Sequence, residues 1–176
     1  MNYIALLRGI NVSGKNKLPM ANLRALCEDL GWQKVQSYIQ SGNLKFEWEG
    51  EAIEAAANLS QAIQEKFGYE VPVLVYPQNY FQKALQNPFL EEQANLELKS
   101  LHVTLLEAAP TSEKIEALAS KDHKGDQWKV VEDRVYLHCP NGYGRTKLTN
   151  SYLEKNLGQT ATTRNWKTLN KLAVWE

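Results

Sequence analysis

The sequence is poor in cysteine and contains no long apolar run. Cys27 and Cys139 are its only cysteines, and unpaired thiols of this kind are typical of a reducing compartment. No apolar run approaches the roughly 18 residues that a helix needs to span a bilayer. The apolar stretch at residues 3–7 is too short for a signal peptide, and its positive charge follows rather than precedes it. We therefore expect a cytoplasmic protein without a membrane partner.

The sequence also lacks the common motifs of metal and nucleophile chemistry. Its three histidines, His102, His123 and His138, show no metal-ligand spacing, and no C-x-x-C, H-E-x-x-H or G-x-S-x-G motif occurs. His102 and His138 alternate with apolar neighbours, which is typical of strand residues that have no role as bases. We therefore predict no metal and no cofactor.

The net charge of zero conceals an uneven distribution of charge. Residues 1–27 contain four Lys and Arg and no acid, and residues 141–176 contain six Lys and Arg against two acids. The intervening residues 28–140 contain ten Lys and Arg against eighteen Asp and Glu. The two acid-poor stretches, narrowed to residues 8–20 and 140–172, predict one basic surface that binds an anionic, phosphate-bearing partner.

Hydrophobic periodicity predicts an α+β protein built from two small units. The pattern over residues 1–86 gives the order β-α-β-β-α-β of a ferredoxin-like unit. Residues 87–99 are predicted to be a connector, and residues 100–176 a second, divergent β-α-β-β-α unit with C-terminal helices, packed on the first. Strands are expected at 3–7, 35–39, 44–48, 71–76, 101–106, 127–132 and 135–139, and helices at 19–30, 51–67, 80–85, 111–120, 151–157 and 163–172.

The loop after the first predicted strand has the spacing of a phosphate-binding loop but departs from it twice. From Gly9 to Lys15 it reads G-x-x-x-x-G-K. Asn16 stands where the hydroxyl residue that holds magnesium is required, and Pro19 delays the helix that would meet the phosphate. A turn-rich solvated loop and an anion-binding nest of backbone amides both remain open. The candidate ligand-binding residues here are Arg8, Asn11, Lys15 and Lys17.

The predicted turn at residues 40–43 is a second candidate. Gln40, Ser41 and Asn43 carry amide and hydroxyl groups that suit a polar ligand edge. The alternative is a tight hairpin turn in which Gly42 takes the special backbone conformation. The sequence alone does not separate the two.

A third candidate covers residues 140–150 and 160–168, which contain no carboxylate. Each stretch runs into a predicted helix start, capped by Asn150 or Ser151 in the first case and by Thr162 or Thr163 in the second. Helix starts beside cations bind anions, and aromatic rings stack on bases or sugars. The alternative to ligand binding is core packing for Trp166, and pairing with acidic residues for Arg145 and Arg164. The candidate residues are Asn141, Tyr143, Arg145, Lys147, Arg164, Asn165 and Trp166.

These three segments resemble a bacterial family known only as domain of unknown function 1697. The resemblance is carried by four strings, which read ALLRGINVSGKNKLPM from Ala5, YIQSGNLKF from Tyr38, PNGYGRTKLTN from Pro140 and ATTRNWKTLNKL from Ala161. Ser13 stands where the family more usually has a second glycine. The resemblance implies a compact α+β protein with a ferredoxin-like unit, and it implies no activity and no catalytic residue.

The sequence favours binding over catalysis, because the basic segments contain neither a carboxylate nor a histidine that could transfer a proton. The leading hypothesis is a binding module for nucleic acid or a nucleotide-like molecule. One alternative is an enzyme for a phosphorylated or nucleotide-like substrate, which requires a carboxylate or His138 in the cleft that holds Arg145. Another is an interaction surface for an acidic protein. The hypothesis of a single surface requires the three segments to converge, with Lys15 and Arg145 on the same face.

Overall fold

The structure is a computed structural model that describes all residues from 1 to 176, and it has a mixed α+β architecture with two four-stranded antiparallel sheets. The chain divides into two compact units, Met1–Tyr80 and Phe81–Glu176. Each unit contains one of the sheets.

The first unit runs in the order β-α-β-β-α-β, as the sequence predicts. Its sheet has the strand order β2-β3-β1-β4, and every pair of neighbouring strands is antiparallel. The elements are β1 (Asn2–Leu7), α1 (Met20–Asp29), β2 (Gln33–Tyr38), β3 (Asn43–Glu47), α2 (Ala52–Phe67) and β4 (Val73–Pro77).

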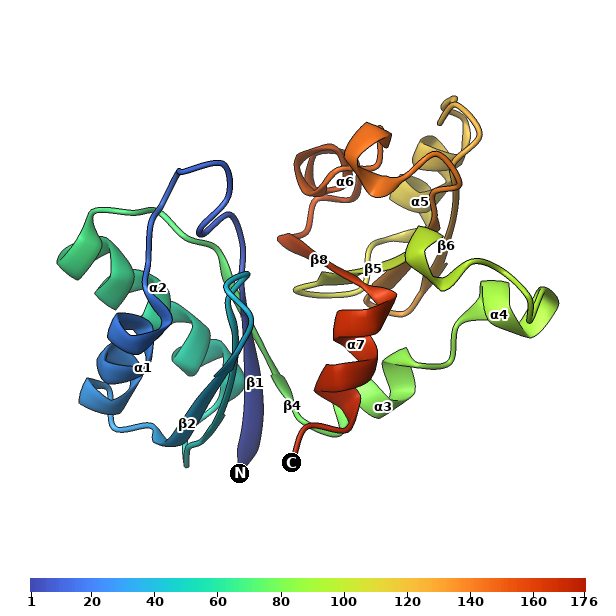
Figure 1. Ribbon diagram of the computed structural model, residues 1–176. Coiled ribbons are helices and arrows are strands. Elements are labelled where there is room, and N and C mark those ends of the chain that lie inside the picture. Colours follow the sequence, from blue (N-terminus) through green and yellow to red (C-terminus); the bar gives the residue numbers. More distant parts are fainter. The chain divides into compact units, whose positions relative to one another are not determined.

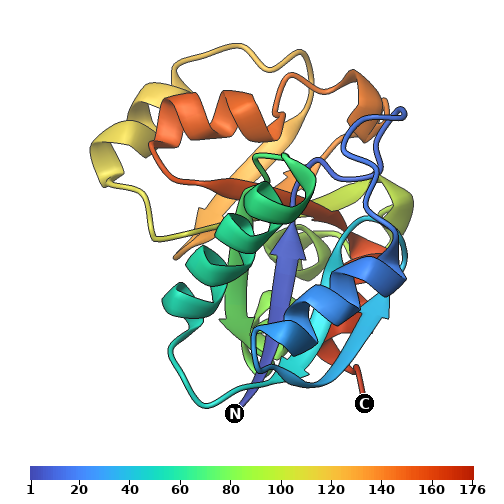
Figure 2. The same cartoon turned by 90° about the vertical axis from the view of Figure 1, so that its left-hand side faces the viewer.

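The helices α1 and α2 lie side by side on one face of the first sheet (Figures 1 and 2). Alternate residues of β1, namely Tyr3, Ala5 and Leu7, point into the core beneath the two helices. The indole of Trp32 stacks on Phe46 with ring centroids 3.7 Å apart. This apolar layer fixes β1 at the centre of the sheet, and so fixes the position at which the loop that follows β1 begins.

The second unit has the strand order β6-β7-β5-β8, again antiparallel throughout. Its elements follow α3 (Tyr80–Ala84), which crosses the boundary between the units. They are α4 (Pro88–Glu92), the 3-10 helix η1 (Leu98–Ser100), β5 (Leu101–Leu106), α5 (Ser112–Ala119), β6 (Gln127–Val131), β7 (Arg134–His138), the 3-10 helix η2 (Tyr143–Arg145), α6 (Asn150–Leu157), β8 (Ala161–Asn165) and α7 (Trp166–Ala173).

Helices cover both faces of the second sheet. α5 and α6 pack together over one face, where their apolar residues join those of β5 and β7 in one core. α7 lies on the other side of this sheet from α5 and α6 (Figures 1 and 2) and contacts β5, β8 and η1. The end of β8, the start of α7 and η1 are therefore neighbours.

The final strand β8 corrects the sequence prediction. Residues 163–165 were expected to begin a helix, but they belong to β8, and α7 begins only at Trp166. The β-branched Thr162 and Thr163 favour a strand, and Thr163 pairs with Thr104 of β5, their hydroxyl oxygens 2.7 Å apart. The second unit therefore ends in β-α-β followed by a helix.

The helix caps also differ from those predicted. Thr149 caps α6, its Oγ1 accepting from the backbone N–H of Tyr152 at 3.3 Å, and Asn165 caps α7 by accepting from the N–H of Thr168 at 2.8 Å. The predicted caps were Asn150 or Ser151 and Thr162 or Thr163. A shift of one to three residues is common when several adjacent residues can cap.

The predicted connector at residues 87–99 contains α4 and the first two residues of η1. Asn87 caps α4 by accepting from the N–H of Phe89 at 2.9 Å. None of the helices has the length and apolar character required to cross a membrane.

Candidate functional site

Two of the three predicted segments meet in the first unit. The backbone N–H of Leu7 donates to the carbonyl of Gly42 at 2.8 Å, and Nδ2 of Asn11 donates to the carbonyl of Gln40 at 3.0 Å. The loop after β1 and the turn between β2 and β3 therefore form one surface, which we call the first-unit loop surface, residues 8–20 and 40–43.

The amides of Asn11 and Asn43 hold this surface together. Nδ2 of Asn11 also donates to the carbonyl of Leu18 at 2.9 Å, and its Oδ1 accepts from the N–H of the same residue at 2.8 Å. Asn43 is buried and donates to the carbonyl of Tyr38 and to Oγ of Ser41. Both side chains therefore have a clear structural role.

Two of the three cations of the first-unit loop surface are open to solvent. Lys15 and Lys17 are exposed, and neither side chain forms an ion pair or a hydrogen bond within the protein. Arg8, immediately after β1, is half-buried, and Gln40 and Ser41 are exposed. A hollow of about 420 Å³ is lined by Asn11, Gly14, Lys17, Leu18, Pro19, Met20 and Gln40, none of them acidic.

The loop departs from a phosphate-binding loop in its geometry as well as its sequence. The helix α1 begins at Met20, behind Pro19, and no side chain caps it. Residues 9, 11, 13, 14 and 16 all have positive φ, so the chain turns repeatedly before the helix starts. Its backbone amides therefore cannot point along a helix axis in the way a nucleotide triphosphatase requires.

The third predicted segment belongs to the second unit. Its first part lies in and around η2, and its second part lies in β8 and at the start of α7. Tyr143 and Arg145 lie in η2, with Asn141 exposed just before it. The guanidinium of Arg145 is exposed and forms no ion pair. Lys147 donates to the carbonyl of Asp122 at 3.2 Å and lies 5.8 Å from the ring centroid of Tyr152.

Tyr143 stacks on His102. Their ring centroids are 4.5 Å apart with an interplanar angle of 19°. Strand register places His102 directly opposite Asn165 of β8. Nδ1 of His102 is buried and forms no hydrogen bond of good geometry, although the nearby backbone of Ser100 favours the protonated ring. Burial is the larger effect and lowers the pKa of His102.

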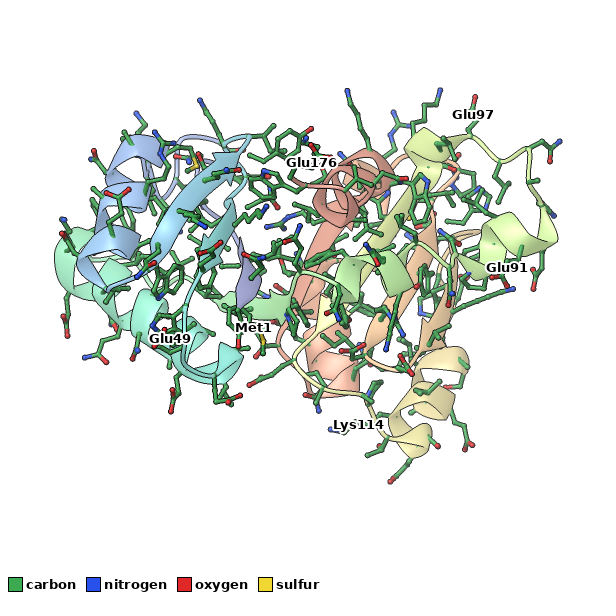
Figure 3. All side chains as sticks on the ribbon, turned by 90° about the horizontal axis from the view of Figure 1, so that it is seen from below. Met1, Glu49, Glu91, Glu97, Lys114 and Glu176 are labelled. Carbon is green, nitrogen blue, oxygen red and sulfur yellow. The ribbon has the colours of Figure 1, made fainter.

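A pocket of about 620 Å³ opens beside His102, and we call it the β5–α7 pocket. Its two cations, Lys99 and Lys167, are exposed, and the indole of Trp166 is largely buried. Lys99 forms an ion pair with the exposed Glu97 at 3.3 Å, and Figure 3 shows Glu97 pointing away from the protein. The pocket is lined by Leu98, Lys99, His102, Asn165, Trp166, Lys167 and Asn170, and no carboxylate is among them.

Arg164 lies outside the lining of this pocket, because neighbouring residues of a strand point to opposite faces. Its Nη1 donates to Oγ1 of Thr162 at 2.9 Å and to the carbonyl of Thr163 at 3.0 Å. Burial lowers the pKa of Arg164 to about 10, and Tyr143 partly opposes that shift. The guanidinium still carries its charge at neutral pH.

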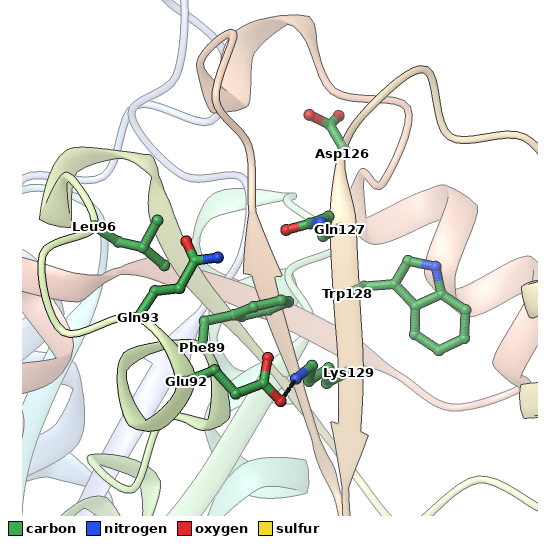
Figure 4. Close-up of a pocket in the computed structure, with 8 residues that line it drawn as sticks. All are labelled: Phe89, Glu92, Gln93, Leu96, Asp126, Gln127, Trp128 and Lys129. Atoms are coloured by element: carbon green, nitrogen blue, oxygen red, sulfur yellow. Dashed lines mark hydrogen bonds and ion pairs between the residues drawn. The ribbon is translucent and has the colours of Figure 1, made fainter.

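A pocket of about 390 Å³ between α4 and β6 differs in its charge (Figure 4). Glu92 forms an ion pair with Lys129, whose ammonium lies 5.0 Å from the centroid of Phe89. Asp126 adds a second carboxylate to the lining. These two carboxylates would repel an anion, so the α4–β6 pocket is less suited to an anionic ligand than the β5–α7 pocket.

The structure gives the histidines different surroundings. Nδ1 of His138 lies 3.1 Å from Oε1 of Gln127, and its ring is 5.9 Å from that of Phe89, beside the α4–β6 pocket. His102 lies in β5, as the sequence predicts for a strand residue, and its imidazole also lines the β5–α7 pocket. Its lining residues Lys99 and Asn170 also lie outside the predicted set, and no sequence signal distinguishes them from other surface residues.

The comparisons with known proteins agree with this architecture. Residues 1–136 match the family described as protein of unknown function (DUF1697). The chain belongs to this family. It is also similar to the solved structure of the conserved bacterial protein SP0830 from Streptococcus pneumoniae, with 25% sequence identity and a TM-score of 0.72 over 98% of this chain and 96% of that one. No curated protein matches the chain.

Proposed function

We propose that the protein binds a phosphate-bearing ligand in the β5–α7 pocket. The observation that carries this proposal is a pocket with two cations, Lys99 and Lys167, and no carboxylate in its lining. Phosphate oxygens accept hydrogen bonds from ammonium groups, and a phosphate placed among carboxylates would be repelled.

The start of α7 adds to the attraction. The eight-residue helix begins at Trp166, and its first-turn backbone N–H groups carry partial positive charge. Lys167 lies in the same turn and forms no ion pair within the protein. The ammonium and the helix start therefore favour an anion together, and neither has to be released from an acid first.

The first-unit loop surface is a second basic feature in this proposal. Lys15, Lys17 and Arg8 would attract a second anionic group there, with Gln40 and Ser41 as hydrogen-bonding side chains. Charge and exposure support this role, since the hollow of the first-unit loop surface is lined by no acid. We also propose that each unit is a ferredoxin-like domain, because both have the element order β-α-β-β-α-β and equivalent strand orders.

Isothermal titration calorimetry with inorganic phosphate and AMP tests this proposal. We expect Lys167→Ala to weaken AMP binding by roughly fivefold to thirtyfold, the equivalent of about 1–2 kcal/mol for a lost charged hydrogen bond. Lys171→Ala is the matched control, because Lys171 belongs to the same helix but does not line the pocket. Equal affinity in both variants, or no binding of either probe to the wild-type protein, would refute the proposal.

A second candidate function is catalysis on the same ligand, and His102 is the observation that favours it. The imidazole lines the pocket, and its lowered pKa leaves the ring neutral and able to accept a proton at neutral pH. Incubation of the protein with a panel of phosphate monoesters, followed by mass spectrometry, would detect turnover. Activity that survives His102→Gln unchanged would exclude His102 as its catalytic residue.

A further inference from the structure

We infer that the ligand of the β5–α7 pocket is a single nucleotide, with a planar ring against the apolar wall of the pocket and its phosphate at the cations. This inference rests on the proposed function and goes beyond it by naming the ligand class. Support for a nucleotide comes from those pocket side chains that would not contact a phosphate group, namely the apolar, aromatic and amide side chains.

The wall of the pocket is apolar and rigid on one side. Leu98 is 54% exposed, and it lines the pocket together with Trp166. The indole of Trp166 is only 7% exposed, so surrounding residues hold it in place. An exposed leucine beside a fixed indole offers apolar contact that inorganic phosphate or a sugar phosphate cannot use.

His102 is a second ring held in place. Tyr143 covers one of its faces at 4.5 Å, so the remaining face or edge must supply the surface that lines the pocket. A ring already stacked on a tyrosine loses little conformational freedom when a ligand meets it. Planar heterocycles favour contacts with such rings, whether face to face or through the edge.

Two amides provide a matched donor and acceptor. Asn165 uses Oδ1 to cap α7, which leaves its Nδ2 without a protein partner. Asn170 uses Nδ2 to donate to the carbonyl of Trp166 at 2.7 Å, which leaves its Oδ1 as an acceptor. Both residues line the pocket. A nucleobase edge presents donors and acceptors side by side, and amide side chains are common partners for such edges.

The size and the charge of the second unit favour one nucleotide over a nucleic acid. A pocket of about 620 Å³ lies in the range that small ligands occupy. Residues 81–176 contain thirteen Lys and Arg against twelve Asp and Glu, whereas domains that bind nucleic acid are usually strongly basic.

The experiment compares AMP, GMP, CMP and UMP with ribose 5-phosphate, inorganic phosphate and a single-stranded octanucleotide by calorimetry on the full chain. We expect at least one nucleotide to bind about tenfold or more tightly than ribose 5-phosphate, as ring contacts require. Leu98→Ala should lower the affinity for the nucleotide by a clearly larger factor than it lowers the affinity for ribose 5-phosphate. Val131→Ala, which truncates another exposed apolar residue of the same unit, should change neither affinity.

The outcomes separate this inference from the proposed function. Equal affinity for ribose 5-phosphate and for all four nucleotides would overturn the nucleotide inference and leave phosphate binding standing. Tightest binding of the octanucleotide, falling steeply with salt, would overturn it in favour of nucleic acid. If none of the phosphate compounds binds, the proposed function fails, and the nucleotide inference fails with it.

Discussion

The indole nitrogen of Trp128 donates a hydrogen bond to Nδ1 of His123 at 3.2 Å, and the hydroxyl of Tyr152 lies 3.4 Å from Nε2 of the same imidazole. An indole N–H can only donate, so Nδ1 must accept, and the ring must be the neutral tautomer with its proton on Nε2. Trp128 points to the opposite side of β6 from Phe89, which leaves it free to meet His123 (Figure 4).

This arrangement predicts that stability falls as the pH falls. Burial lowers the pKa of His123, the charge of Lys147 lowers it further, and Asp122 and Asp126 partly oppose that shift. The folded-state pKa therefore lies below the unfolded value of about 6.5. The stabilisation from the neutral ring is complete above the unfolded pKa, and it is lost as the pH falls below that value towards and through the folded pKa.

Urea titrations at pH 7.5, 6 and 5 measure this effect. The free energy of unfolding should decline more steeply from pH 7.5 to pH 5 in the wild-type protein than in the His123→Gln variant, whose side chain does not titrate. Identical slopes would contradict the role assigned to His123. An NMR titration of the imidazole in the folded protein would give its pKa independently of unfolding.

The sequence predicts most of the fold because periodicity and turn residues are local signals. Apolar spacing correctly gives the helix α2, and Glu51 and Glu54 form its capping box. The strand β8 is missed because its string ATTRN is followed at once by a helix, and five residues carry too little periodicity to separate the two. The β-branched Thr162 and Thr163 are only a weak local signal for a strand, and the long-range pairing of β8 with β5 decides between strand and helix.

The candidate site is less predictable from sequence than the fold. The sequence identifies Asn165 and Trp166 because cations and turn residues surround them, and both line the β5–α7 pocket. It gives no signal for Lys99 and Asn170, since their place in the pocket depends on how η1 packs against α7. The sequence suggests Asn11 as a ligand-binding residue because of its amide, but in the structure that amide donates hydrogen bonds to the carbonyls of Leu18 and Gln40.

Gly42 should be the least replaceable glycine of the first-unit loop surface. A Cβ at this position would lie 2.7 Å from Cβ of Leu7 and 2.9 Å from Cδ1 of Ile10, and φ is +82°. Gly42→Ala therefore adds a clash to backbone strain, and we expect it to destabilise the protein by about 2–4 kcal/mol. Thermal unfolding followed by circular dichroism measures the loss.

Gly9→Ala separates the two effects. Gly9 has φ of +75° but no atom within 4 Å of the added Cβ, so this variant suffers the backbone strain alone. We expect it to lose about 1–2 kcal/mol, less than Gly42→Ala. Equal losses in the two variants would show that the close approach of Gly42 to Leu7 and Ile10 has no energetic consequence.

Asn11→Ala should destabilise the first unit even in the absence of ligand. The substitution removes three hydrogen bonds, two to the backbone of Leu18 and one to the carbonyl of Gln40, and leaves alanine at φ of +53°. We expect a loss of about 1–3 kcal/mol in urea titrations. Asn22→Ala, at an exposed position of α1, is the control and should change stability by less than about 0.5 kcal/mol. A fully stable Asn11→Ala variant would return Asn11 to the set of side chains available for a ligand.

Both cysteines should resist alkylation in the folded protein. Cys27 and Cys139 have no exposed surface. The pKa of Cys139 is raised to about 11, mainly by burial and in spite of a side-chain hydrogen bond with Thr146 that lowers it, and burial raises the pKa of Cys27 still further. Only the thiolate attacks iodoacetamide, so at pH 8 each thiol is both inaccessible and protonated. Mass spectrometry should find no adduct after an hour under native conditions and two adducts in 6 M guanidinium. An adduct on Cys139 alone in the folded protein would reveal local opening of the core beneath α5 and α6, which urea well below the unfolding midpoint should then accelerate.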